Sequence, residues 1–370
     1  MQPDSKTSSG APQARSEILN ISPYIQGKSS LAGEEEPIKL SSNESPFGPC
    51  PAAIEAYQSI ASRLHRYPDG SQDELRQAIA GVYQLNVDKI ICGNGSDEIL
   101  DLIYRSYLSP GDEVILSSNH FVMCYLYAKV QGANIIFADE HDFVTDVDDL
   151  LSKVTPRTRM VTLANPNNPT GTYLNNEQIR KIHSGLPSNV LFIIDSAYAE
   201  YVTPDDFDSG MDLVEQYENV IVTRTFSKIY GLSALRLGWA YCPSAIIDIL
   251  QRVRSPFNTN SAAMAAATAA VKDTAYITKV KEHTAGWINK IENELSKLGI
   301  VITPSVANFY LLHFNQCEDK SAKSAAKFLE SKNIIPRSMT TTEGEDVVRI
   351  SVGLDSENES VIAALQEYMA

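Results

Sequence analysis

Apolar positions follow two rhythms along the chain, one typical of buried strands and one typical of amphipathic helices. From residue 89 onward, short apolar runs are separated by segments in which apolar residues recur every three or four positions. Short apolar strands that alternate with helices form parallel sheets covered on both faces. The pattern therefore predicts an α/β fold with a mostly parallel seven-stranded sheet flanked by helices. The predicted strands are 90–92, 113–116, 134–138, 159–163, 190–194, 220–223 and 237–241.

Helical spacing also appears before and after this region. Helices are predicted at 51–64 and at 71–83, and a long helical stretch at 258–298. The apolar face of the first helix consists of Ile54, Tyr57, Ile60, Ala61 and Leu64. Beyond residue 300, strands and helices are less regularly interleaved, which predicts a smaller α+β domain. Its predicted elements are strands near 308–313 and 347–352 and helices near 321–332 and 356–369.

This pattern predicts four parts of the chain. The first 16 residues are polar and rich in Ser, Pro and Gln, so we expect a disordered tail there. The predicted parts are the tail at 1–16, an N-terminal arm at 17–44 that packs on the small domain, a large domain at 45–272 and a small C-terminal domain at 273–370.

Composition narrows the class of protein. The length of 370 residues suggests about two domains, and 43% apolar with 21% charged residues is typical of a globular protein. The net charge of −15, without a basic block, argues against nucleic acid as a partner. The chain has no apolar run of 18 residues and no signal-peptide core, so we expect no membrane span and no secretion.

The cysteines point to the compartment. Five cysteines are scattered through the chain, and none forms a Cys-x-x-Cys pair. This spacing indicates neither a metal site nor a disulfide framework. We therefore expect a cytoplasmic protein without a bound metal.

Lys228 lies in the stretch that carries the most chemistry. It follows the predicted strand 220–223 directly, with Ser227 before it and Arg236 eight residues on. A lysine in a poorly hydrated place can form a Schiff base with an aldehyde, while a hydroxyl and a guanidinium suit a phosphate. These three side chains suggest pyridoxal 5'-phosphate (PLP), its aldehyde on Lys228. A solvated loop lysine near a surface arginine is the alternative.

The ends of other predicted strands supply the remaining parts of such a site. Gly95, Ser96 and Asp97 open a helix after strand 90–92, so their N–H groups could hold a phosphate, although Ser96 could equally be an ordinary N-cap. Phe121 could lie on the cofactor ring, or pack in the core. His120 is expected to be structural rather than a base.

Two further loops follow strands 159–163 and 190–194. The loop at 165–171 contains two prolines and three asparagines, and an amide there could donate to a phenolate oxygen. Asp195 ends an apolar strand and needs a cationic partner, which a protonated pyridine nitrogen would provide. Tyr198 could reach the ring oxygen. Asp195 could instead be a helix N-cap.

Together, these motifs resemble the fold-type-I PLP-dependent aminotransferases, and among them the histidinol-phosphate aminotransferases, over roughly residues 20–368. The resemblance rests on the segments 22–24, 41–44, 66–70, 93–98, 165–171, 195–198, 227–236 and 349–353. The chain departs from the family pattern at Ser45, at Ser196 and in the acidic segment 340–346, and none of these departures touches the cofactor residues.

The resemblance implies a role for each site residue. Lys228 is the catalytic lysine, Asp195 pairs with the pyridine nitrogen, and Asn168 and Tyr198 hold the ring oxygen. It also implies a homodimer with shared active sites, because Tyr67 would reach the phosphate in the partner subunit. The remaining implied contacts are Gly95, Ser96, Asp97, Ser227 and Arg236 with the phosphate, Phe121 with the ring, and Tyr24, Arg337 and Arg349 with the substrate.

The implied reaction is amino transfer between L-histidinol phosphate and 2-oxoglutarate in L-histidine biosynthesis. Three alternatives remain open from the sequence. They are an aromatic amino-acid aminotransferase, a PLP decarboxylase of the same fold such as threonine-phosphate decarboxylase, and a non-catalytic ligand-binding domain of a regulator.

Overall fold

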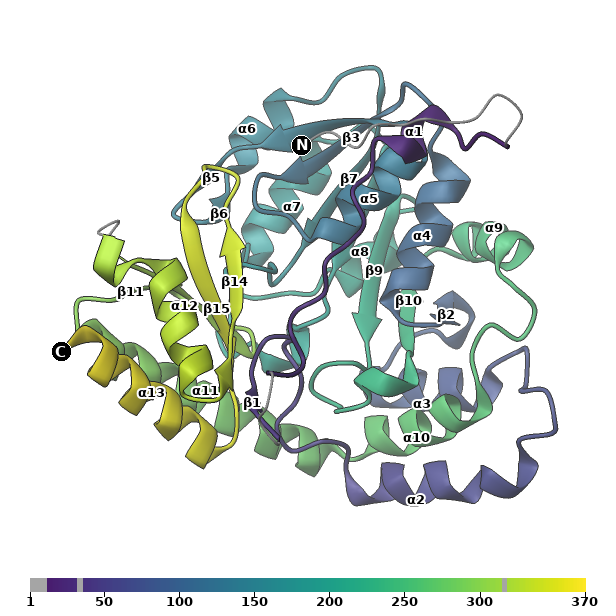
Figure 1. The fold of residues 1–370 in the computed structure, drawn as a ribbon. Coiled ribbons are helices and arrows are strands. Elements are labelled where there is room, and N and C mark those ends of the chain that lie inside the picture. Colours follow the sequence, from purple (N-terminus) through teal and green to yellow (C-terminus); the bar gives the residue numbers. More distant parts are fainter. Residues whose placement is uncertain (1–11, 32–35, 315–317) are drawn as a thin grey trace.

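The computed structural model describes residues 12–31, 36–314 and 318–370 (Figure 1). Most of the predicted tail therefore lies outside the described residues, and so does Cys317. The other four cysteines are buried free thiols. Within the described ranges, no helix is both long and apolar enough to span a membrane.

A seven-stranded sheet forms the larger part of the structure. Its strand order is β2-β10-β9-β8-β7-β3-β4, and only β10 runs antiparallel to its neighbours. The predicted α/β fold with a mostly parallel sheet is confirmed, with strand ends shifted by one or two residues. The strands are β2 (Ile90–Gly93), β3 (Glu113–Ser117), β4 (Asn134–Ala138), β7 (Thr158–Ala164), β8 (Leu191–Asp195), β9 (Val220–Thr225) and β10 (Gly238–Tyr241).

Helices cover both faces of this sheet, because successive strand residues point to opposite sides. On β8, for example, Phe192 and Ile194 belong to one apolar core and Ile193 to the other. One face is covered by α4 (Ser96–Tyr107), α5 (Val122–Val130) and α9 (Ser244–Val253). The other is covered by α3 (Asp73–Tyr83), α6 (Val147–Ser152), α7 (Asn176–Gly185), α8 (Met211–Gln216) and α10 (Ser261–Lys272).

Two helix predictions were wrong in part. The helix predicted at 51–64 is α2 (Pro51–Ser59) followed by a 3₁₀ turn, and of its predicted apolar face Tyr57 and Leu64 are 48% and 73% exposed. Instead, α2 buries Ala53 in the core that it shares with α10. The stretch 258–298 is not one helix, since Asp273 separates α10 from α11 (Thr274–Ser296) and caps the latter.

A second, four-stranded antiparallel sheet lies beside the first and has its own apolar core. Helices α11, α12 (Ala322–Ser331) and α13 (Asp355–Met369) pack on it. Strands β12 and β15 and both C-terminal helices were predicted, whereas β11, β13 and β14 were not. The strands are β11 (Val301–Thr303), β12 (Phe309–His313), β15 (Asp346–Ser351) and β14 (Arg337–Thr340), with β13 (Ile334–Ile335) nearby and the hairpin β5 (Glu140–His141) and β6 (Val144–Thr145) on the large unit.

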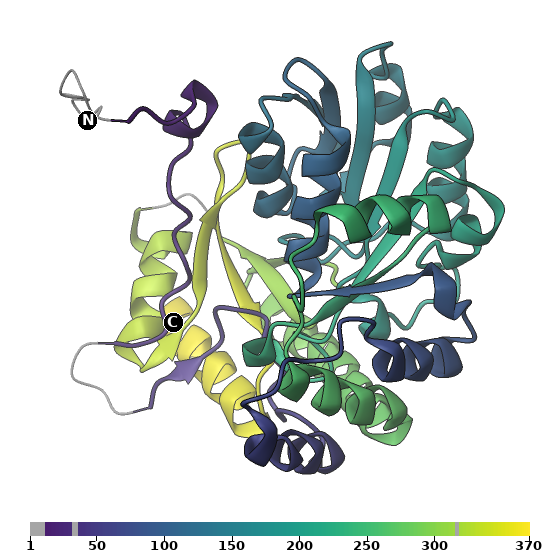
Figure 2. The same ribbon diagram turned by 90° about the vertical axis from the view of Figure 1, so that its right-hand side faces the viewer.

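The N-terminal segment contacts both units. Strand β1 (Ile38–Lys39) pairs in parallel with β13, and Lys28 forms an ion pair with Glu330. Helix α1 (Ser16–Leu19) instead lies against α5. The segment between α1 and β1 runs past the hairpin β14–β15 (Figures 1 and 2). We propose the division at 272/273 because Asp273 separates α10, which packs on the large core, from α11, whose second half packs on the small one.

Gly231 provides a test of the backbone around Lys228. Its N–H donates to the carbonyl oxygen of Lys228 at 2.9 Å, its φ is +69°, and an added Cβ would lie 2.2 Å from backbone atoms of Gly48. We expect Gly231→Ala to lower the free energy of unfolding by about 3 kcal/mol or more, because neither backbone can yield cheaply. Urea denaturation measures this change.

Gly81 is the matched control. It lies in α3, and nothing stands within 4 Å of an added Cβ. Gly81→Ala should therefore raise the free energy of unfolding by about 0.5–1 kcal/mol, through helix propensity. Equal stability of the two variants would contradict the close approach of Gly231 to Gly48.

Candidate active site

The site lies where β7, β8 and β9 end. These strands are parallel and in register, with Ala164 beside Asp195 and Asp195 beside Thr223. The loops that leave their carboxyl ends therefore meet at one edge of the sheet. They surround a narrow cavity of about 110 Å³, called here the inner cavity, whose lining includes Ser96, Asp97, Phe121, Asn168, Asp195, Tyr198, Ser227, Lys228 and Arg236.

One end of the inner cavity is built for an anion. Gly95, with φ +85°, is the N-cap of α4, and no side chain caps this helix. Arg236 donates to Ser227 Oγ at 3.3 Å and to Asp97 Oδ2 at 3.1 Å, and a Cβ on Gly95 would stand 2.9 Å from its Nη2. Free helix N–H groups, a hydroxyl and a guanidinium thus converge on a space that a side chain at 95 would fill. The alternative of Ser96 as N-cap was wrong, because Ser96 is the first helical residue.

Asp195 is the more deeply buried of the two carboxylates that line the inner cavity, the other being Asp97. Its side chain is buried, and Thr223 donates a hydrogen bond to its Oδ1 at 2.7 Å. Burial raises the pKa of Asp195 to about 6, although this bond and the charge of Lys228 act in the opposite direction. The alternative of Asp195 as a helix N-cap was wrong, since Asp195 is the last residue of β8 and the following 3₁₀ turn begins at Ala199.

Lys228 lies at the boundary of the inner cavity, half-buried. Its Nζ lies 3.5 Å from the carbonyl oxygen of Ser42 and 5.6 Å from the centre of the Tyr198 ring. Tyr198 accepts a hydrogen bond from Asn43 Nδ2 at 3.0 Å, which leaves its own hydroxyl proton to be donated elsewhere. Lys228 and Tyr198 thus face the same small space as Asp195.

Asn43 was missed by the sequence reasoning as a site residue. It is buried, has φ +55°, and is held by Ser351 and Asn308 as well as by Tyr198. Its partners lie 155 to 308 residues away in the sequence, so no local pattern marks its role. The available signals were the density of turn-forming residues at 41–49 and the family resemblance of segment 41–44, neither of which assigned a role to Asn43.

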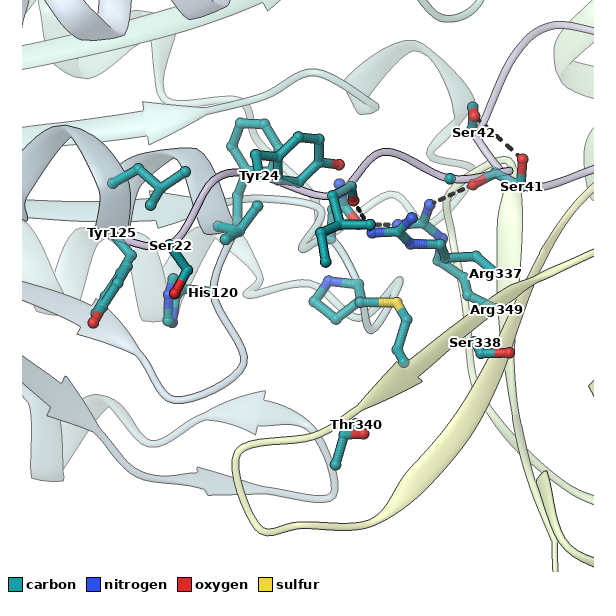
Figure 3. A pocket seen from close by; sticks show the side chains of 18 of the residues that line it. Ser22, Tyr24, Ser41, Ser42, His120, Tyr125, Arg337, Ser338, Thr340 and Arg349 are labelled. Atoms are coloured by element: carbon teal, nitrogen blue, oxygen red, sulfur yellow. Dashed lines mark hydrogen bonds between the residues drawn. The ribbon is translucent and has the colours of Figure 1, made fainter. Parts of the chain in front are cut away.

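A larger cavity of about 640 Å³ adjoins the inner one and is called here the outer cavity. Phe121, Asn168 and Lys228 line both cavities. Tyr24, Arg337 and Arg349 line only the outer one, and Figure 3 shows the two arginines at one end and His120, Tyr125 and Ser22 at the other. The structure thus gathers three segments around it, namely the N-terminal arm, the large unit and the hairpin β14–β15.

The two arginines give the outer cavity a cationic end. Arg349 is 8% exposed, donates to Asn168 Oδ1 at 2.5 Å and to the carbonyl oxygen of Ser41 at 3.1 Å, and keeps a buried Nε without a hydrogen-bond partner. Burial lowers the pKa of Arg349, and the charge of Arg337 lowers it further. Arg337 donates only to the carbonyl oxygen of Ile25. Within the described ranges neither arginine forms an ion pair, so both could bind an anionic ligand.

His120 closes the opposite end of the outer cavity. Its Nδ1 lies 3.2 Å and 3.1 Å from the carbonyl oxygens of Ser117 and Ser118, and its ring stacks on Phe137. Burial lowers the pKa of His120, which favours the neutral ring. Its position and contacts are those of a wall residue.

Tyr67 does not reach either cavity of its own chain. Its side chain is 83% exposed and stacks on Phe257 at 4.8 Å between ring centres. It lines a separate hollow of about 420 Å³ together with Leu64 and Pro256.

Comparison with known proteins defines the class. Residues 35–365 match the model of the aminotransferase class I and II family, and the chain belongs to this family. A histidinol-phosphate aminotransferase of Rhodopseudomonas palustris is 46% identical over 354 residues, covering 95% of this chain and 97% of that protein. One of Paramagnetospirillum magneticum is 46% identical over 359 residues, covering 97% and 99%.

The fold agrees with this class. The crystal structure of histidinol-phosphate aminotransferase from Sinorhizobium meliloti in complex with pyridoxal-5'-phosphate is similar with a TM-score of 0.88, 26% identity and 98% coverage of both chains. The chain is therefore an enzyme with the fold-type-I aminotransferase architecture.

The buried carboxylate of Asp195 predicts a pH dependence for the cofactor-free protein. A pKa raised by folding stabilises the protein at low pH, and this stabilisation is lost as the pH rises from about 4 through about 6. Asn at position 195 does not titrate. Between pH 4 and pH 7, wild type should therefore lose on the order of 2 kcal/mol of unfolding free energy relative to Asp195→Asn.

Urea denaturation of both cofactor-free proteins at the two pH values measures the difference. Asp248→Asn is the control, because Asp248 is an exposed carboxylate on α9. A similar pH dependence for both substitutions would show that Asp195 is not desolvated.

Proposed function

We propose that the chain is a PLP-dependent aminotransferase that moves an amino group between L-histidinol phosphate and 2-oxoglutarate in L-histidine biosynthesis. The observation that carries the proposal is the junction of the two cavities. A lysine, an acid and an anion cradle lie in the inner cavity, and next to it lie two arginines that form no ion pair with any described residue. The names and the identity of the relatives support the same substrate.

PLP fits the inner cavity on three counts. Asp195 needs a cation, which a protonated pyridine nitrogen provides, and the open N-terminus of α4 with Arg236 matches a phosphate. Lys228 supplies the amine that PLP requires. When bound, PLP supplies an electron sink that allows a Cα–H bond to break.

The chain's own groups then orient and move protons. Lys228 Nζ would carry the proton between the substrate Cα and C4′ of the cofactor, because among the described residues it is the only lysine lining the inner cavity. Tyr198 and Asn168 donate hydrogen bonds to the ring oxygen through the hydroxyl and amide protons that their observed contacts leave free. Phe121 lies against the ring. The phosphate contacts come from Gly95, Ser96, Asp97, Ser227 and Arg236.

Arg337 and Arg349 hold the substrates. L-histidinol phosphate carries a phosphate monoester and 2-oxoglutarate carries two carboxylates, and a guanidinium fork binds either group in two-point fashion. Tyr24 covers the substrate from the N-terminal arm, since it lines the outer cavity. One cationic end thus serves both half-reactions.

We also propose that the protein is a homodimer with shared active sites. Leu64, Tyr67 and Phe257 are exposed apolar side chains grouped around one hollow, which favours burial against a second copy. Tyr67 would then reach the phosphate in the partner's site. The compartment that we propose is the cytoplasm, in keeping with four buried free thiols.

An aromatic amino-acid aminotransferase is the second candidate. The outer cavity contains Tyr24, Tyr125 and Phe121, and such a wall accepts a phenyl ring as well as an imidazole. A decarboxylase of the same fold would use the same cofactor residues without consuming 2-oxoglutarate.

A single-turnover experiment separates these activities. L-histidinol phosphate added to the PLP-loaded protein should bleach the visible absorbance of the cofactor faster, and at lower concentration, than L-phenylalanine does, because its phosphate meets the two arginines. 2-Oxoglutarate should restore the absorbance. Lys228→Ala is the control and should show neither change.

The alternative activities predict different results in the same experiment. Bleaching by L-phenylalanine alone would replace the histidinol-phosphate assignment by an aromatic one. Release of carbon dioxide without restoration by 2-oxoglutarate would indicate a decarboxylase. A Lys228→Ala variant with full activity would remove Lys228 from the mechanism.

Mixing two defective variants tests the shared site. If Tyr67 acts across the interface, a dimer that pairs Lys228→Ala with Tyr67→Ala has one site with both defects and one with neither. After subunit exchange, the mixture should recover about a quarter of wild-type activity, since about half of the dimers are hybrids. Each variant alone is the control, and a mixture no more active than their average would place Tyr67 outside the partner's site.

A further inference from the structure

We propose that Asn119 is a positioning residue, which fastens the hairpin β14–β15 to the large unit and thereby sets the affinity for anionic substrates. The inference rests on the proposed function, because it takes Arg337 and Arg349 on this hairpin as the groups that bind the substrate. Asn119 itself lines neither cavity.

Asn119 is a buried meeting point of three segments. It is 6% exposed, and its Oδ1 accepts hydrogen bonds from the N–H of Thr342 at 3.1 Å and from the hydroxyl of Thr342 at 3.3 Å. Its Nδ2 and its backbone N–H donate to the two carboxylate oxygens of Glu140, at 2.8 Å and 3.0 Å. Its carbonyl oxygen accepts from Asn167 Nδ2 at 2.7 Å. All its hydrogen-bonding groups are therefore occupied.

Thr342 lies in the turn of the hairpin, at the far end from the arginines. Arg337 and Arg349 pair across the two strands, five residues before and seven residues after Thr342. At about 3.3 Å per residue, the contact with Asn119 lies about 17 Å along the hairpin from the two guanidinium-bearing residues. A contact at this distance controls the tilt of the whole hairpin.

Hydrogen bonds join the two sides of the turn and connect it to the small sheet, so the turn can transmit this control. Thr341 and Glu345 form a backbone hydrogen bond at 2.8 Å, and Glu345 contacts His313 of the neighbouring strand β12 at 2.9 Å. The hairpin and the small sheet therefore move together. A loss of the Asn119 contact shifts both arginines rather than only the turn.

The hairpin is also fastened at its other end, next to the same loop of the large unit. Arg349 donates to Asn168, and the preceding residue, Asn167, donates to Asn119. The contacts thus form a closed ring that runs from Asn168 through Arg349, the hairpin and Thr342 to Asn119 and Asn167. When a substrate anion engages Arg349, the contact at Asn119 is the part of the ring that keeps the hairpin in place.

Steady-state kinetics of the PLP-loaded protein test this role. Asn119→Ala should raise KM about tenfold for both L-histidinol phosphate and 2-oxoglutarate, because two hydrogen bonds that hold the arginines are lost, while kcat stays within twofold. Thr342→Val removes only the hydroxyl and should raise KM about two- to threefold. In the Asn119→Ala background, Thr342→Val should have no further effect.

Ser118→Ala is the matched control. Its hydroxyl donates to Ala138, within the same loop region but not to the hairpin, so KM should not change. An unchanged KM in Asn119→Ala, a loss confined to kcat, additive effects of the two substitutions, or an equal rise in Ser118→Ala would each overturn the inference.

Amide hydrogen exchange separates this inference from the proposed function, because it needs no turnover. In the PLP-loaded wild type, residues 340–346 should exchange slowly, and Asn119→Ala should exchange faster there and bind succinate, as an anionic probe, about tenfold more weakly. If L-histidinol phosphate is not a substrate, the proposed function fails while this measurement still decides the role of Asn119. Equal exchange and equal succinate affinity in both proteins would overturn that role.

Discussion

The site depends on the parallel register of β7, β8 and β9. The hydrogen bond from Thr223 to Asp195 joins two of these strands at that register. This register places the last residue of β8 beside Thr223, two residues before β9 ends, and beside Ala164, where the asparagine loop begins. An acid at the end of β8 and an amide and a lysine from two loops therefore meet within one small cavity. The backbone pairing of the strands fixes the spacing of the three strand ends that lead to these side chains.

The site gathers positively charged side chains, although the whole chain is negatively charged. The chain carries a net charge of −15, yet Arg236, Lys228, Arg337 and Arg349 gather around the two cavities. Because the pKa of Arg349 is lowered by burial and by the charge of Arg337, these two arginines destabilise each other in the absence of an anion. A bound phosphate or carboxylate relieves that repulsion. The net negative charge disfavours every anion at a distance, the substrate included, so selectivity among anions is decided within a few ångströms.

The sequence was sufficient to predict the features that depend on residues close together in the chain. Strand ends are marked by apolar runs, so the large sheet and the loops that carry Asn168, Asp195 and Lys228 could be predicted from the pattern. Features that depend on contacts between residues far apart in the sequence could not be predicted. Asn43 and Asn119 depend on partners 155 to 308 and 223 residues away, and the short strands β11, β13 and β14 are defined by their pairing rather than by their composition. Periodicity identified an apolar face on α2 but could not show that much of it lies outside the core of its own chain.

The outer cavity is lined by residues from all three parts of the fold. Tyr24 comes from the arm, Asn168 from the large unit and Arg349 from the small unit, so the volume of the cavity depends on how these parts are held relative to one another. The arm is held by few contacts, among them the bond from Arg337 to Ile25, whose side chain is 79% exposed. An anion that binds Arg337 therefore acts on the arm as well as on the hairpin. The free energy of binding such an anion therefore depends on the arm and on the hairpin together. Under the proposed function, a phosphate monoester and a dicarboxylate bind in turn to the same two arginines, so both depend on the positions of these two segments.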